Sequence, residues 1–137
     1  MITNGFFWHV HHNTLMEWSD DINERIKFIR TKKPKEEIKT RLKLLKPVKG
    51  KIPMILINAK RAYYKAENAY FKRYMAVDGA KTNSLRKARK AYDKAEDSYV
   101  KALRCKSVNS RIKALHKKEC PDCPWNGKTR TIFPEKW

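Results

Sequence analysis

The sequence has little glycine, few cysteines and no long apolar run. Four glycines among 137 residues leave no glycine-rich loop of the kind that holds phosphates in nucleotide-binding proteins. Three cysteines are too few, and odd in number, for a secreted disulfide framework. No apolar stretch approaches the roughly 18 residues of a membrane span, and the first residues lack the basic and apolar regions of a signal peptide. These absences favour a cytoplasmic protein, and they favour neither a membrane partner nor a small-molecule substrate.

Acidic residues are scarce relative to basic ones. Lys and Arg number 33 against 14 Asp and Glu, which gives a formal net charge of +19. The excess lies in the middle of the chain, because residues 1–23 contain no Lys or Arg and residues 119–137 are balanced. A net charge of magnitude about 2–8 suffices for solubility. The excess therefore predicts a polyanionic partner.

The apolar pattern predicts a mainly α-helical protein on a small N-terminal base. Residues 6–18 alternate as two short β-strands joined by a turn. Residues 22–30 and 38–45 then place apolar side chains at helical spacing. We expect residues 1–51 to form this base of a β-hairpin and two short helices. Residues 47–53, which contain Pro and Gly, are expected to be a linker.

Residues 52–118 predict a long, basic, antiparallel helical hairpin. Helices at 54–77 and 83–118 are separated by the turn signal Asp78-Gly79, and each contains an Ala-Tyr-x-Lys-Ala motif or close variant that repeats after seven residues. A seven-residue period is typical of a coiled-coil seam. The close seam is expected at four alanines: Ala62, Ala69, Ala91 and Ala95. The tail, 119–137, is expected to pack back on the base, giving one compact unit overall.

The tail carries a motif resembling a zinc knuckle. Cys120 and Cys123 have Cys-x2-Cys spacing, at which two thiolates bind one metal ion, and His116 lies one helical turn earlier. Structural zinc takes four protein ligands. The candidates for the fourth lie near the N-terminus: His9, His11 and His12. His9 and His11 share one face of the predicted strand. The sequence therefore predicts a structural zinc site, with two unmetallated cysteines in a turn as the alternative.

Several motifs carry a resemblance that covers nearly the whole chain. They are Trp-His-Val-His-His at 8–12, Pro-Val-Lys-Gly-Lys at 47–51, the heptad repeats, and Cys-Pro-Asp-Cys-Pro-Trp at 120–125. Together they resemble a family of small uncharacterised phage and metagenomic proteins. The resemblance implies a viral or mobile-element setting and the host cytoplasm. No activity is known for that family, so it implies no catalytic residue.

A nuclease is one alternative that the N-terminal segment raises. A Val-His-His strand, a turn, a return strand and a helix resemble the ββα-metal core of His-Asn-His endonucleases. In that interpretation His11 or His12 activates water, and Asn13 or Asn23 positions the substrate. However, the helix expected at 22–30 contains no second metal-binding histidine, and no acidic residue directly precedes the histidine pair.

The basic residues favour a non-enzymatic protein that binds RNA or DNA along the phosphate backbone. Lysine outnumbers arginine 23 to 10, and lysine acts as a point charge whereas arginine reads guanine edges. Binding is therefore expected to be largely independent of sequence. The candidate contacts are Lys39, Lys43, Lys46, Lys65, Lys72, Lys87, Arg89, Lys90, Lys94 and Lys101.

Two further alternatives concern the same helices. The repeat tyrosines are expected in the core, with stacking on bases as the other interpretation: Tyr63, Tyr70, Tyr92 and Tyr99. The basic hairpin also suits a protein-binding module or inhibitor. Such a module would dock on an acidic or nucleic-acid-binding surface of a host or viral machine. Tight binding to one protein, with weak affinity for bulk nucleic acid, would favour that interpretation.

Overall fold

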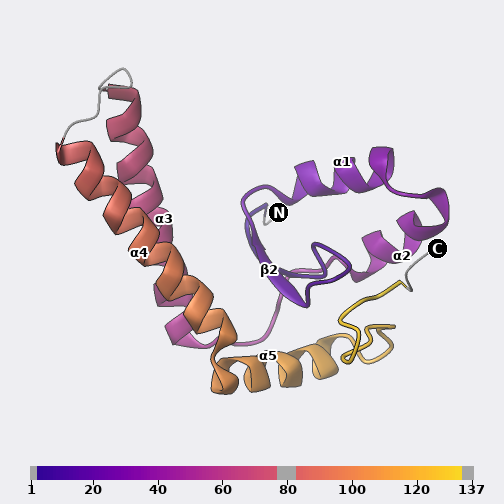
Figure 1. Cartoon of the computed structure of the whole chain (residues 1–137). Helices are drawn as coiled ribbons and strands as arrows, with labels where there is room; N and C mark the ends of the chain where they lie inside the picture. Colours follow the sequence, from indigo (N-terminus) through magenta and orange to yellow (C-terminus); the bar gives the residue numbers. More distant parts are fainter. Residues whose placement is uncertain (1–2, 77–82, 134–137) are drawn as a thin grey trace. The chain divides into compact units, whose positions relative to one another are not determined.

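The computed structural model describes residues 3–76 and 83–133, and these residues are mainly helical (Figure 1). The elements follow in the order β1 (Gly5–Trp8), β2 (Met16–Ser19), α1 (Ile22–Lys32), α2 (Lys35–Leu44), α3 (Met54–Ala76), α4 (Asn83–Arg104) and α5 (Lys106–Glu119). The predictions of a mainly helical chain and a small N-terminal β-hairpin are confirmed. Among the helices described, none combines the length and apolar character needed to cross a membrane.

The chain divides into two compact units. We call Met1–Gly50 with Ala114–Trp137 the terminal unit, and Lys51–Lys113 the hairpin unit. The first boundary lies within one residue of the expected one, and the tail groups with the N-terminal base. Two units differ from the single compact unit that the sequence predicts. The reason is that the long helices pack on each other and so form a unit of their own.

The terminal unit is built on a short β-hairpin. β1 pairs antiparallel with β2, from Gly5 opposite Ser19 to Trp8 opposite Met16. The other edge of β1 is also paired, because the Trp8 N–H donates to the Lys46 carbonyl at 2.8 Å. The Val48 N–H likewise donates to a β1 carbonyl, at 3.0 Å. The segment expected to be a linker therefore begins as an edge of this small sheet.

Local sequence signals set the helices of this unit. The side chain of Asp21 caps α1 by accepting a hydrogen bond from the Asn23 N–H at 3.0 Å. Pro34 separates α1 from α2, because a proline disfavours helical geometry at the residue before it. The hairpin and α1 then share an apolar cluster: Phe7, Val10 and Ile22, with Ile26 and Leu45 packed against it.

In the hairpin unit, α3 and α4 pack on each other (Figure 1). The Tyr63 ring lies 5.7 Å, between centroids, from the rings of both Tyr92 and Tyr99. Further along α3, the Tyr70 ring lies 5.6 Å from Tyr92, and Arg73 hydrogen-bonds Ser84. Contacts that advance along α3 and retreat along α4 make the pair antiparallel. The expected turn at 78–79 lies outside the described residues.

Tyrosines make most of the seam between these helices, and of the four alanines expected there three are exposed: Ala62, Ala69 and Ala91. Ala95 is half-buried, and Tyr99 and Ala102 are buried. The repeat is therefore packed about one residue out of the expected register, because the larger tyrosine rings bury more apolar area than alanine methyl groups. The repeat tyrosines pack ring against ring between the helices. This packing favours the interpretation as core residues over the interpretation as residues that stack on bases.

The expected single helix from 83 to 118 is interrupted at Cys105. α4 ends at Arg104 and α5 begins at Lys106. The Cys105 carbonyl accepts from the Asn109 N–H at 2.9 Å, while its Sγ lies 3.2 Å from Ser107 Oγ. Hydrogen bonds from Ser107 and from the following backbone lower the pKa of the Cys105 thiol. Cys105 thus caps α5, and it is half-buried.

Candidate metal centre

His9 occupies a bend that the strand pattern did not predict. β1 ends at Trp8, and His9 has φ +53°, a left-handed conformation that is uncommon outside glycine. Its N–H donates to the Leu15 carbonyl at 3.0 Å. The expectation that His9 and His11 share one strand face is wrong, because the strand does not continue through His9. The bend instead places the buried His9 side chain beside the C-terminal residues.

The end of α5 positions the C-terminal candidates. His116 lies on the last turn of the helix, and the Cys120 N–H donates to the His116 carbonyl at 2.7 Å. The Cys123 N–H then donates to the Cys120 carbonyl at 3.2 Å. These two hydrogen bonds hold the helix end and the Cys-x2-Cys turn in one local structure.

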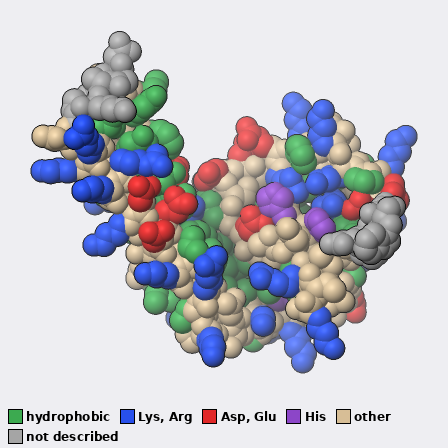
Figure 2. Space-filling model, in the orientation of Figure 1, with side chains coloured by type: hydrophobic (Ala, Val, Ile, Leu, Met, Phe, Trp, Pro, Cys, Tyr) green, Lys and Arg blue, Asp and Glu red, His purple; other side chains and the backbone are tan. Residues whose placement is uncertain are grey.

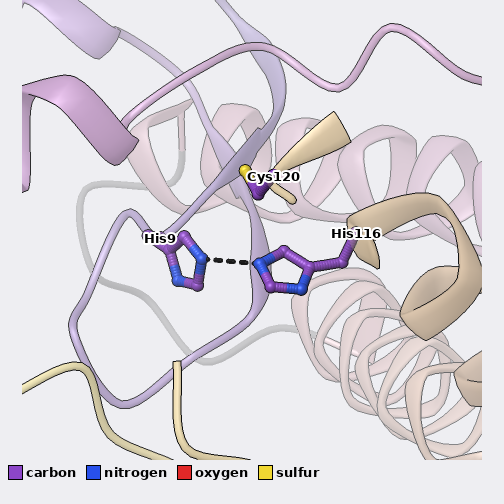
Figure 3. Close-up of side chains that lie close together, drawn as sticks. All are labelled: His9, His116 and Cys120. Carbon is purple, nitrogen blue, oxygen red and sulfur yellow. Dashed lines mark hydrogen bonds between the residues drawn. The ribbon is translucent and has the colours of Figure 1, made fainter. Parts of the chain in front are cut away.

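Three candidate ligands meet between the N-terminal bend and the end of α5, and a fourth lies beside one of them. His9 Nε2 lies 2.9 Å from His116 Nε2, and the ligand atoms of His9, His116 and Cys120 are all within 4.8 Å of one another (Figure 3). Cys123 Sγ lies 3.1 Å from His9 Nε2. We call these four residues the His2Cys2 group. The group contains the predicted knuckle residues and one of the N-terminal histidines proposed as a fourth ligand.

Burial keeps the members of the group uncharged. It lowers the pKa of His9 to about 4, with a further contribution from His116, and it lowers the pKa of His116. Burial also raises the pKa values of the Cys120 and Cys123 thiols. Neutral imidazoles are ready to bind a metal ion. Thiols become ligands as thiolates, so a bound metal would displace their protons.

Aromatic rings and one carboxylate surround the group. The Trp8 ring lies 5.3 Å from the His116 ring, and the Trp125 ring lies 5.5 Å from the His9 ring. The Glu119 carboxylate accepts hydrogen bonds from Trp8 Nε1 at 3.2 Å, from the Lys49 N–H at 2.7 Å and from the Gly50 N–H at 2.9 Å. Glu119 thus ties the helix end to two distant segments, and no local pattern in the sequence marks it.

The other two histidines lie apart from this group. His11 is exposed, and its Nδ1 lies 2.8 Å from Glu17 Oε1. The His12 ring lies 6.2 Å from the Phe133 ring. The pKa of His12 is lowered mainly by burial and next by the positive charge of Arg41. From the sequence, both are candidates for the fourth metal ligand, and one or the other is a candidate for the general base of a nuclease. Within the described residues, neither joins the His2Cys2 group.

The basic residues proposed as nucleic-acid contacts are all exposed. Three belong to the terminal unit: Lys39, Lys43 and Lys46. Seven lie on the hairpin: Lys65, Lys72, Lys87, Arg89, Lys90, Lys94 and Lys101. Arg89 is also paired with Asp93 at 3.2 Å and lies 5.3 Å from the centre of the Tyr70 ring. Figure 2 shows Lys and Arg side chains projecting along the hairpin, beside exposed apolar side chains.

Comparison with known proteins identifies no relative. Protein-family models, curated proteins and solved structures give no match to the chain. The resemblance to a phage family therefore stays a prediction.

Proposed function

We propose that the protein binds nucleic acid without enzymatic activity, through the phosphate backbone and mainly on the α3–α4 hairpin. One observation carries this proposal. Successive residues of a helix are rotated by about 100°, and on this geometry the exposed lysines of α4 fall within about 60° of one another around the helix axis. These lysines are Lys87, Lys90, Lys94 and Lys101. Two of the buried residues of α4, Leu85 and Tyr99, face the other way, and the third, Ala102, lies about 90° from the stripe. A lysine stripe opposite the packed face is free to follow a polyanion.

The charge balance of the hairpin supports the same proposal. α3 and α4 together contain twelve Lys and Arg residues and four acidic residues. Lysines spaced seven residues apart recur about every 10 Å along a helix. That spacing suits intermittent phosphate contacts and offers no means of reading base edges. We therefore expect affinity that depends strongly on salt and little on base sequence.

The test compares two triple variants that lose the same charge. In one, Lys87, Lys94 and Lys101 become Gln; in the other, Lys27, Lys32 and Lys128 become Gln, all of them exposed outside α3 and α4. Fluorescence anisotropy measures binding of each variant to RNA and DNA, single- and double-stranded, across salt concentration. The hairpin variant should reduce the slope of log affinity against log salt by about 2–3 on duplex DNA.

The control variant should change that slope much less. Equal effects of the two variants would show that the charge acts without a specific surface. Binding by the wild type that is equal for every nucleic acid and vanishes by physiological salt would refute the proposal. Pull-down of a single acidic protein partner at a stoichiometric ratio would then favour the protein-binding alternative.

We also propose that the His2Cys2 group holds a structural zinc ion. Zinc favours four-coordinate sets of imidazole nitrogens and thiolates. Here His9, His116 and Cys120 already lie together beside tryptophan rings, and Cys123, next to His9, would supply the fourth ligand. A bound ion would join two segments more than 100 residues apart in sequence. Its role would be to stabilise the terminal unit, since all four positions are filled by protein ligands.

Metal analysis of the purified full chain tests this second proposal. We expect about one zinc per chain, and Co²⁺ substitution should give the absorption bands of thiolate-ligated tetrahedral cobalt. Cys120→Ser should lower both the metal content and the melting temperature. Cys105→Ser, a matched control at the cysteine outside the group, should change neither the metal content nor the cobalt spectrum. Wild-type protein that contains no zinc and is not stabilised by added zinc would refute the site.

A further inference from the structure

The α3 helix exposes two aromatic rings that the packing of the hairpin does not bury. Tyr64 is 52% exposed and Phe71 is 50% exposed. Each directly follows the packed tyrosine of its repeat, Tyr63 or Tyr70. Because seven residues separate the two exposed rings, they lie on the same side of α3, about 10 Å apart along its axis. The heptad repeat therefore presents two equivalent aromatic positions at the surface.

Each exposed ring is followed by an exposed lysine. The pairs are Tyr64 with Lys65 and Phe71 with Lys72. The matching repeats of α4 place Asp93 and Val100 where α3 has the exposed ring. Of the two helices of the hairpin, α3 carries these pairs and the matching repeats of α4 do not, so the coiled-coil packing that both helices share does not account for them.

Neighbouring rings support the Phe71 side chain from one side. The Phe71 ring lies 5.4 Å from the Tyr70 ring and 6.1 Å from the Tyr92 ring, and meets the latter edge-on. Half of the residue is nevertheless exposed. A ring that is held in place and open on one side loses little conformational entropy when a flat partner stacks on it.

We propose that the Tyr64–Lys65 and Phe71–Lys72 pairs are two repeated nucleotide subsites for single-stranded nucleic acid. Each ring stacks on one unpaired base, and the lysine beside it contacts a phosphate. Aromatic stacking on a basic surface is the common mode by which proteins bind single strands without reading sequence. Paired bases inside a duplex keep their faces stacked on one another. This proposal rests on the proposed function and adds the strand form that the hairpin prefers.

The charge of α3 argues against a second copy of the chain as the occupant. A self-complementary contact at this face would bring Lys65 and Lys72 of two chains together, with Arg61 and Arg73 on the same helix, against a single acidic residue, Glu67. Like charges brought together in this way are destabilising. A single strand supplies both the flat apolar faces and the negative charge that this surface lacks.

The test measures the full-length protein with fluorescent oligo-uridine, oligo-deoxythymidine and a DNA duplex, each of about 15 nucleotides per strand. The wild type should bind the single strands more tightly than the duplex. A double variant, Tyr64→Ala with Phe71→Ala, should weaken single-strand binding by at least tenfold and change duplex binding by less than about twofold. A second double variant, Tyr64→Leu with Phe71→Leu, keeps apolar bulk on the helix and should show the same selective loss.

Two controls separate stacking from charge and from folding. Ile55→Ala removes a side chain of α3 that is 58% exposed and belongs to no aromatic–lysine pair, and it should leave both affinities unchanged. Circular dichroism should show the same helix content in every variant. If the double variants bind single strands as tightly as the wild type does, this inference is overturned and the proposed function is not. If the wild type binds neither strand form, the proposed function falls with it. A wild-type dimer that the double variants dissociate would also overturn the inference.

Discussion

Glu119 connects three segments of the terminal unit, and its removal should destabilise that unit. The carboxylate accepts from the indole N–H of Trp8 and from the backbone N–H groups of Lys49 and Gly50. Burial alone would raise the pKa of Glu119, but these hydrogen bonds outweigh it and hold the pKa below its usual value. Glu119 is therefore ionised at neutral pH, and its hydrogen bonds are charge-assisted.

The three hydrogen bonds differ in what their loss would cost. Trp8 is fully buried, so Glu119→Ala would leave its indole N–H without a partner at a cost of about 1–3 kcal/mol. Lys49 is exposed, so water can replace the lost acceptor at its N–H. Gly50 is half-buried, so the cost of leaving its N–H without Glu119 is intermediate. We expect Glu119→Ala to lower the free energy of unfolding by about 2–3 kcal/mol. Glu119→Gln, which keeps one acceptor oxygen, should lose about half as much.

Tryptophan fluorescence offers an assay for this unit alone, because all four tryptophans belong to its sequence segments. Urea unfolding should show the loss, and the melting temperature should fall by about 10–20 °C. Both are measured with zinc present and with a chelator, which separates this effect from any bound metal. Lys118→Ala, an exposed neighbour on the same helix, should be neutral. Free energies within about 0.5 kcal/mol of wild type for both Glu119 variants would refute the reasoning.

Other substitutions test the close contacts and the thiols. A Cβ at Gly50 would meet Leu115 Cδ2 inside normal contact distance and Glu119 Oε2 at 2.9 Å, so Gly50→Ala should lower stability by about 1–3 kcal/mol in the tryptophan assay. Ala69 is exposed and Ala102 is buried; Ala69→Leu should leave helix unfolding unchanged, whereas Ala102→Leu should destabilise it by about 1–3 kcal/mol. A thiol reagent should label Cys105 fastest, because its pKa is lowered while burial raises those of the other two cysteines; equal rates at all three would contradict this.

Short-range patterns in the sequence predicted the elements and much of the candidate metal site. Asp21 caps α1 and Pro34 separates two helices as such residues usually do. The prediction that His116 lies with the two cysteines is confirmed for Cys120, whose ligand atom lies within 4.8 Å of that of His116. The choice among the N-terminal histidines was not decidable from alternation, because it depends on the left-handed bend at His9. That conformation is stabilised by tertiary contacts, and no residue near it signals a break in the strand.

The heptad repeat shows why periodicity predicts a packed pair of helices but not their register. In Ala-Tyr-Tyr-Lys and Ala-Tyr-Phe-Lys, several positions repeat every seven residues, so spacing alone allows more than one of them to form the seam. Alanine would allow the helices to approach closely, and tyrosine would bury more apolar area. Only the facing helix decides between them, and here it offers tyrosines that pack ring against ring. That choice of register leaves Tyr64 and Phe71 half-exposed beside lysines. A shift of the seam by one residue thus determines which rings stabilise the hairpin and which stay exposed on its surface.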